Sequence, residues 1–137
     1  MKAVHYGVAF ARQFNARLEL LHVLEPLPAV PELGPVGYVP RRESAEALEV
    51  IRHNVGETTE CHASLRSGAP YTEIVKAAAE LQVDLIVIAT RGNRGFIRAV
   101  LGSTAEKVVR HATCPVLIVR ETEHDFVPIP VVRPADE

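Results

Sequence analysis

One short stretch of the chain, residues 88–109 (IATRGNRGFIRAVLGSTAEKVV), gathers three glycines and three arginines directly after an apolar run. Gly92 and Gly102 lack side chains, so a ligand can lie against the main chain at these positions. Arg91 adds a charged donor that is suited to an anion. These residue types together indicate an anion-binding loop.

The residues that follow the loop strengthen this interpretation. Helical spacing resumes near Gly102-Ser103, and a helix N-terminus offers free N–H groups and the positive end of its dipole. Ser103 and Thr104 add hydroxyl donors. The spacing matches neither a Walker A motif nor a Rossmann fingerprint. On spacing alone, a plain strand-to-helix connection is therefore the simpler interpretation.

Composition restricts the classes of protein to which the chain can belong. Its 137 residues fit one domain, and a net charge of −2 argues against a general nucleic-acid binder. No apolar run is long enough to span a membrane, and the start carries no signal-peptide pattern. The two cysteines and six histidines show no metal-ligand or disulfide spacing. We expect a cytoplasmic location with reduced thiols.

Hydrophobic periodicity predicts four helices that alternate with four strands, beginning with a helix. Helical spacing covers 1–16, 43–55, 70–81 and about 103–112, and the strands are expected at 18–24, 58–68, 84–90 and 114–121. Apolar strands separated by amphipathic helices predict an α/β fold, an open parallel sheet with helices on both faces. Five prolines between Pro26 and Pro40 predict a long flexible loop, and 121–137 is expected to be an extended tail.

Several single residues receive structural rather than chemical interpretations. The first helix is expected to direct Phe14 to its apolar face, along with Val4, Val8 and Ala11. His22 is expected to be a hydrogen-bonded core histidine, with lining a pocket as the alternative.

Other polar residues offer little catalytic chemistry. Glu73 and Glu80 are expected on the solvent side of their helix, and Cys114 is expected to be a buried filler. Asp84 fits a cap or a turn at the start of its strand. No Ser-His-Asp or paired-carboxylate arrangement is evident, so enzyme activity has weak support.

The segment DLIVIATRGNRGFIRAVLGSTAEKVVRHATCPVLIV resembles the C-terminal signature of the universal stress protein family. Nucleotide-binding members carry Gly-x-x-Gly, nine residues, and then Gly-Ser/Thr. Here Ala89 stands at the first glycine position, Gly92 is the second, and Gly102-Ser103 follows after nine residues. The stretch LELLHVLEP also looks like its counterpart in the family.

The resemblance implies a five-stranded parallel sheet of order 3-2-1-4-5 and a site for ATP or another adenine nucleotide, which Mg²⁺ can accompany. By position, Val23 would flank the adenine, and Ile88 and Ala89 would lie near the ribose. The phosphates would be surrounded by Arg91, Gly92, Gly102, Ser103 and Thr104. The resemblance also implies a homodimer, which we expect to form through the last strand, Pro115 to Glu121, and the tail.

The family's first strand, with an aspartate that contacts the nucleotide, has no counterpart in this sequence. We expect the natural chain to be longer than the one given. For the chain as given, we expect the strands at 18–24 and 84–90 to pair directly into a four-stranded sheet, with a strand inserted by a partner chain as the alternative. A narrowed adenine pocket and weak nucleotide binding would follow.

The leading hypothesis is an ATP-binding sensor or regulator of the stress response. A slow ATP hydrolase is one alternative, in which Arg91 and the loop amides would stabilise charge. A nucleotide-free dimeric interaction module is another, because the aspartate is missing and Ala89 replaces a glycine.

Overall fold

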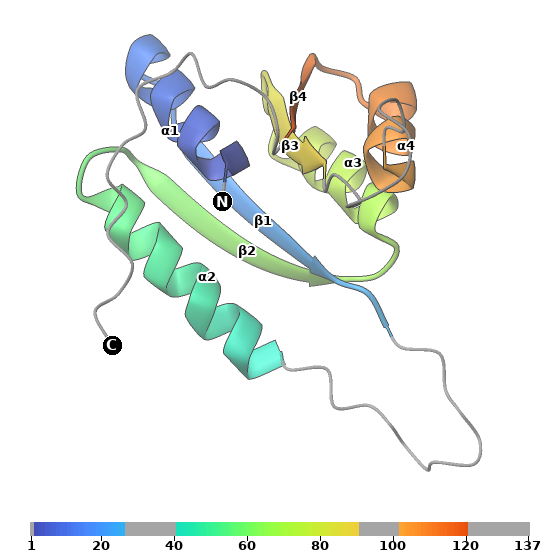
Figure 1. Cartoon of the computed structure of the whole chain (residues 1–137), viewed down its shortest axis with the longest axis horizontal. Helices are drawn as coiled ribbons and strands as arrows, with labels where there is room; N and C mark the ends of the chain where they lie inside the picture. The colour runs from blue at the N-terminus through green and yellow to red at the C-terminus, as the bar shows by residue number, and fades with distance from the viewer. Residues whose placement is uncertain (1, 27–40, 91–101, 121–137) are drawn as a thin grey trace.

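The computed structural model describes residues 2–26, 41–90 and 102–120. Helices and strands alternate within these ranges, as the periodicity predicts (Figure 1). Each predicted element is present, and the fold is α/β. In chain order the elements are α1 (Lys2–Phe14), β1 (Leu18–Leu24), α2 (Arg41–Gly56), β2 (Cys61–Ser67), α3 (Pro70–Glu80), β3 (Ile86–Thr90), α4 (Ser103–His111) and β4 (Val116–Arg120).

The strands form two parallel pairs. β1 lies beside β2 in a register that runs from Leu18 opposite Cys61 to Leu24 opposite Ser67. β3 lies beside β4, with Ile86 opposite Val116 and Thr90 opposite Arg120. Both pairs are joined by helical crossovers, as parallel strands require.

The predicted direct pairing of the strands at 18–24 and 84–90 is wrong. Within the described residues, β1 is bonded only to β2 and β3 only to β4, so the sheet consists of two separate pairs (Figure 1). The reason lies in the helices, because α1 contacts β1 as well as β3 and β4 and so packs on both pairs. A helix is about 10 Å across with its side chains, so α1 can lie over both pairs without drawing them together.

The remaining helices each cover particular strands. α2 contacts β1 and β2, and α4 contacts β3 and β4. α3 contacts β1 and β2 and also packs on α4. The helices α1 and α3 therefore connect the two strand pairs.

The hydrophobic core gathers where α1 and α2 meet the first strand pair. Val8, Leu20, Val55 and Cys61 form one buried cluster there. Gly7 brings α1 close to β1, since a Cβ at this position would lie 3.1 Å from Leu18 Cδ1. A glycine at this point of the helix therefore permits the close packing of α1 on β1.

The prediction for Phe14 is wrong. Its side chain is 70% exposed, whereas Val8 and Ala11 of the same helix are buried. Asn15 follows with a φ of 51°, in the left-handed region, and ends the helix. Phe14 thus lies at a helix end, where the chain turns toward β1 and no neighbouring element of the described structure buries it.

Three sequence predictions concern residues outside the described structure. These residues are 27–40 of the proline-containing loop, 91–101 of the glycine loop and 121–137 of the tail.

Candidate functional site

The N-terminus of α4 is the best-defined part of the candidate site. Gly102 is its N-cap, and no side chain caps the helix there. Ser103 is exposed and Thr104 half-buried, at the first positions of the helix. The N–H groups of a first helical turn have no partner within the helix, so they can donate to an anion.

Gly102 has room on its side-chain side. A Cβ built there meets no described atom within 4 Å, and φ of −56° is open to any residue. The backbone conformation therefore does not require a glycine. Among the described residues, the glycine leaves space at the start of the helix.

Contacts with α3 hold α4 in place. Lys107 Nζ lies 5.0 Å from the centroid of the Tyr71 ring, and that ring lies 5.6 Å from the ring of His111. Glu106, an acidic residue in the first turn, pairs with Arg110 at 2.9 Å. This ion pair partly offsets the negative charge of Glu106, which would otherwise repel an anion at the helix N-terminus.

The backbone of β1 presents polar groups on both sides. Leu18 N–H donates to the Glu60 carbonyl at 2.8 Å, and Leu24 C=O accepts from Gly68 N–H at 3.0 Å. In a parallel ladder, alternate residues bond to the same neighbour. The even-numbered residues of β1 therefore bond to β2. The N–H and C=O groups of Glu19, Leu21 and Val23 point the other way.

β3 shows the same alternation toward β4. Ile86 N–H donates to the Pro115 carbonyl at 3.0 Å, so Ile86, Ile88 and Thr90 bond to β4. The N–H and C=O groups of Val87 and Ala89 point away from it.

The sequence-predicted site residues thus fall into three sets. Val23, Ile88 and Ala89 are half-buried near the carboxyl ends of β1 and β3. Gly102, Ser103 and Thr104 begin α4. Arg91 and Gly92 lie outside the described residues.

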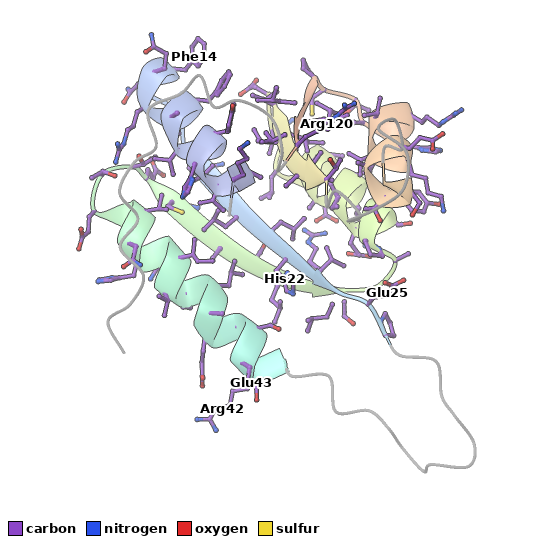
Figure 2. The ribbon with its side chains drawn as sticks, viewed as in Figure 1. Phe14, His22, Glu25, Arg42, Glu43 and Arg120 are labelled. Atoms are coloured by element: carbon purple, nitrogen blue, oxygen red, sulfur yellow. The ribbon has the colours of Figure 1, made fainter. Side chains whose placement is uncertain are left out.

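The prediction of a buried His22 is wrong. His22 is exposed on β1, toward the carboxyl end of the strand (Figure 2). It shares a strand face with Leu20 and Leu24, which are buried. The helices therefore cover some residues of this strand face and not others. The two-residue alternation of side chains does not predict which residues are covered.

The prediction that Glu73 and Glu80 are only solvated is also wrong. Arg66 lies on β2, with one guanidinium nitrogen hydrogen-bonded to Glu80 and another 3.7 Å from Glu73. The hydrogen bond from Arg66 lowers the pKa of Glu80 below its usual value. The signal in the sequence was the seven-residue spacing, which places both carboxylates on one helix face.

The cysteines supply no reactive centre in the described structure. Cys61 is buried, and burial raises the pKa of its thiol. Cys114 is half-buried rather than fully buried as predicted, and both thiols are free. Among the residues described, no three His, Cys, Asp or Glu side chains gather as a metal site would need.

Within residues 2–26, 41–90 and 102–120, no helix combines the length and the apolar character that crossing a bilayer takes.

Comparison with known proteins gives consistent matches over most of the chain. The model of the universal stress protein family matches residues 1–120. A universal stress protein of Methanocaldococcus jannaschii is 30% identical over 131 residues, 91% of this chain and 77% of that protein.

Solved structures give the same match. The structure of the universal stress protein UspA from Lactobacillus plantarum is similar with a TM-score of 0.74 at 27% identity, covering 87% of this chain and 88% of that one. A universal stress protein from Archaeoglobus fulgidus, solved in complex with dAMP, is similar in fold with a TM-score of 0.60 at 24% identity. That match covers 85% of this chain and 83% of the other.

Proposed function

This chain belongs to the universal stress protein family, and we propose that it binds an adenine nucleotide at the carboxyl ends of β1 and β3. The observation that carries the proposal is the N-terminus of α4. Within the described residues it has no side-chain cap, and a Cβ built on Gly102 meets no atom within 4 Å. A related structure that contains dAMP supports the choice of an adenine nucleotide.

The phosphates would lie at the start of α4. The first-turn N–H groups and the Ser103 hydroxyl would donate to the phosphate oxygens, and the helix dipole would add attraction. Arg91 and Gly92 would complete this part of the site, as the family motif implies. We propose ATP as the nucleotide, with Mg²⁺ bound through its phosphates.

The adenine would lie against β1. The outward N–H and C=O groups of Val23 offer one donor and one acceptor, which match the N1 acceptor and the exocyclic amine of adenine. Ile88 and Ala89 of β3 would lie near the ribose. Neutral, half-buried side chains at these positions suit an uncharged base and sugar.

The cellular role would follow from nucleotide binding rather than from turnover. The described residues near α4 offer hydrogen-bond donors but no carboxylate free to activate water, because Glu106 is paired with Arg110. We therefore propose a cytoplasmic sensor or regulator of the stress response.

Replacing Gly102 tests the site. We expect Gly102→Val to lower the affinity for ATP at least about tenfold, because a branched side chain would fill the space in front of the first-turn N–H groups. The fold should survive, since a Cβ meets no described atom there. Isothermal titration calorimetry with ATP measures the affinity, and circular dichroism checks the fold.

Gly56→Val is the matched control. Gly56 ends α2, and a Cβ built there also meets no described atom within 4 Å. Its affinity for ATP should equal that of the parent chain. Equal affinity in Gly102→Val and Gly56→Val would contradict the proposed phosphate site.

A homodimer through β4 and the tail is the second part of the proposal. β4 is apolar from Val116 to Val119, and the N–H and C=O groups of Val116 and Ile118 alternate away from β3. An edge of this kind favours pairing with another strand. Deleting residues 122–137 should weaken the dimer, as measured by light scattering over a concentration series. A mass unchanged by the deletion would contradict the role of the tail.

A further inference from the structure

Tyr71 lies in the first turn of α3, and its ring contacts two side chains of α4. Lys107 Nζ lies 5.0 Å from the centroid of the ring, and the centroid of the His111 ring lies 5.6 Å from it. Lys107 and His111 are four residues apart, so they lie one helical turn from each other on the same face of α4. One aromatic ring of α3 therefore supports α4 at two points along its axis.

The His111 side chain is itself fixed on α4. Its Nδ1 lies 2.8 Å from the carbonyl oxygen of Lys107, and Nδ1 is the donor because a carbonyl oxygen only accepts. This hydrogen bond holds the imidazole ring against its own helix. The Tyr71 ring thus contacts a side chain with little rotational freedom, and such a contact links the position of one helix to that of the other.

The packing of α4 makes its contact with α3 important. Among the described elements, α4 has its most extensive contact with α3, and its contacts with β3 and β4 are smaller. The residues of α4 that are buried, Ala105 and Val108, have short side chains. Within the described structure, the position of α4 therefore depends more on α3 than on either strand.

α3 is in turn attached to the first strand pair. Arg66 of β2 lies 3.7 Å from Glu73 and is hydrogen-bonded to Glu80, and both carboxylates belong to α3. In the register of the pair, Arg66 lies opposite Val23, which is proposed to bind the adenine. α3 therefore connects the strand pair of the adenine part with the helix of the phosphate part.

We infer that Tyr71 is a positioning residue for phosphate binding, which rests on the nucleotide site proposed above. Tyr71 acts without contacting the nucleotide. It supports α4 at Lys107 and His111, about 6 Å and about 12 Å along the helix from Ser103. Support at two such points opposes a tilt of α4, which would displace the first-turn N–H groups. Hydrogen bonds to phosphate oxygens weaken steeply beyond about 3.2 Å, so a small tilt is sufficient to lower the affinity.

A comparison of ATP with adenosine tests this role, because adenosine has no phosphates. Tyr71→Ala should lower the affinity for ATP at least about fivefold and leave the affinity for adenosine within about twofold of the parent value. Tyr71→Phe keeps the ring and should retain the parent affinity for both ligands. Thr72→Ala is the matched control, since Thr72 is exposed in the same helical turn and its truncation should change neither affinity. NMR titration of the whole chain measures both affinities.

His111→Ala removes the same contact from the side of α4, should Tyr71→Ala fail to fold. It should also weaken the binding of ATP and not that of adenosine, and the double variant should lose little more than Tyr71→Ala alone. Residual dipolar couplings of the nucleotide-free chain give the orientation of α4 relative to β4. This orientation should change in Tyr71→Ala and stay as in the parent chain in Tyr71→Phe.

Different results would overturn the role of Tyr71 and the nucleotide site. A parent chain that binds no ATP would contradict the nucleotide site, and the role of Tyr71 with it. Normal binding by the parent chain, together with equal ATP affinity in Tyr71→Ala, would overturn the role of Tyr71 alone. Equal losses for ATP and adenosine would do the same, because the variant would then have disturbed the whole site. An unchanged orientation of α4 in Tyr71→Ala would also overturn it.

Discussion

The two strand pairs differ in their share of the hydrophobic core and in their share of the candidate site. The β1–β2 half (β1, β2 and α2) has seven-residue strands and, together with α1, encloses the core cluster around Leu20 and Val55. The β3–β4 half (β3, β4 and α4) has five-residue strands, and most residues of β3 remain half-buried. It nevertheless carries most of the candidate site, including the start of α4. The core cluster and most of the candidate site therefore lie in different halves.

This difference gives a particular importance to the elements that connect the halves. α1 belongs to the core of the first half and also contacts both strands of the second. α3 contacts the first strand pair and packs on α4. The position of the phosphate-binding helix thus depends on packing that begins in the other half.

The largest effect on stability should come from truncating the α1 core contact. Val8 is 1% exposed within the core cluster, so Val8→Ala should lower the free energy of unfolding by about 2 kcal/mol through lost contacts and a cavity. Urea denaturation followed by circular dichroism measures it. Val109→Ala is the control, because Val109 is 46% exposed and its truncation should cost under about 0.5 kcal/mol. Equal losses in both variants would contradict the central role of α1.

A smaller effect should come from the ion pairs between β2 and α3. Arg66→Met keeps much of the side-chain volume and removes the interactions with Glu73 and Glu80. We expect a loss of about 1 kcal/mol, since the guanidinium is only partly exposed. Arg42→Met is the control, because Arg42 forms a highly exposed pair with Glu46 and should cost less. Urea denaturation that ranks the two variants in the opposite order would contradict this link.

The smallest effect should be that of Glu80→Gln, and it should depend on pH. Arg66 lowers the pKa of Glu80 in the folded chain, so the carboxylate adds stability above its ordinary pKa and loses it as pH falls through the lowered value. The melting temperatures of the parent and the variant should therefore differ slightly at pH 7 and converge in acid. A difference that persists at low pH would show that the charge of Glu80 is not its cause.

Local patterns in the sequence were sufficient to predict the elements. The order of helices and strands is confirmed, and the strand at Leu18–Leu24 has the predicted bounds. Periodicity encodes such elements directly, because side-chain direction repeats every 2 or 3.6 residues. The same patterns also indicated the helix that begins at Ser103, where the candidate site starts.

Features that depend on distant partners could not be predicted in this way. The pairing of strands 18–24 and 84–90 failed because α1 and α3 hold the two pairs without joining them. The exposure of His22 depends on where helix cover ends above β1. The role of Glu73 needed the position of Arg66, which comes from a different element. None of these three features follows a repeating spacing of residues, so the periodicity of the sequence could not predict them.

Each half also holds one cysteine of its own, Cys61 in β2 and Cys114 just before β4. The thiol of Cys61 is buried and its pKa is raised, whereas Cys114 is half-buried. Alkylating reagents attack thiolates, so Cys61 is modified only when the first half opens. The rate of labelling at Cys61 thus reports the opening of the first half, and the partly accessible Cys114 of the same chain is the internal reference for reagent reactivity.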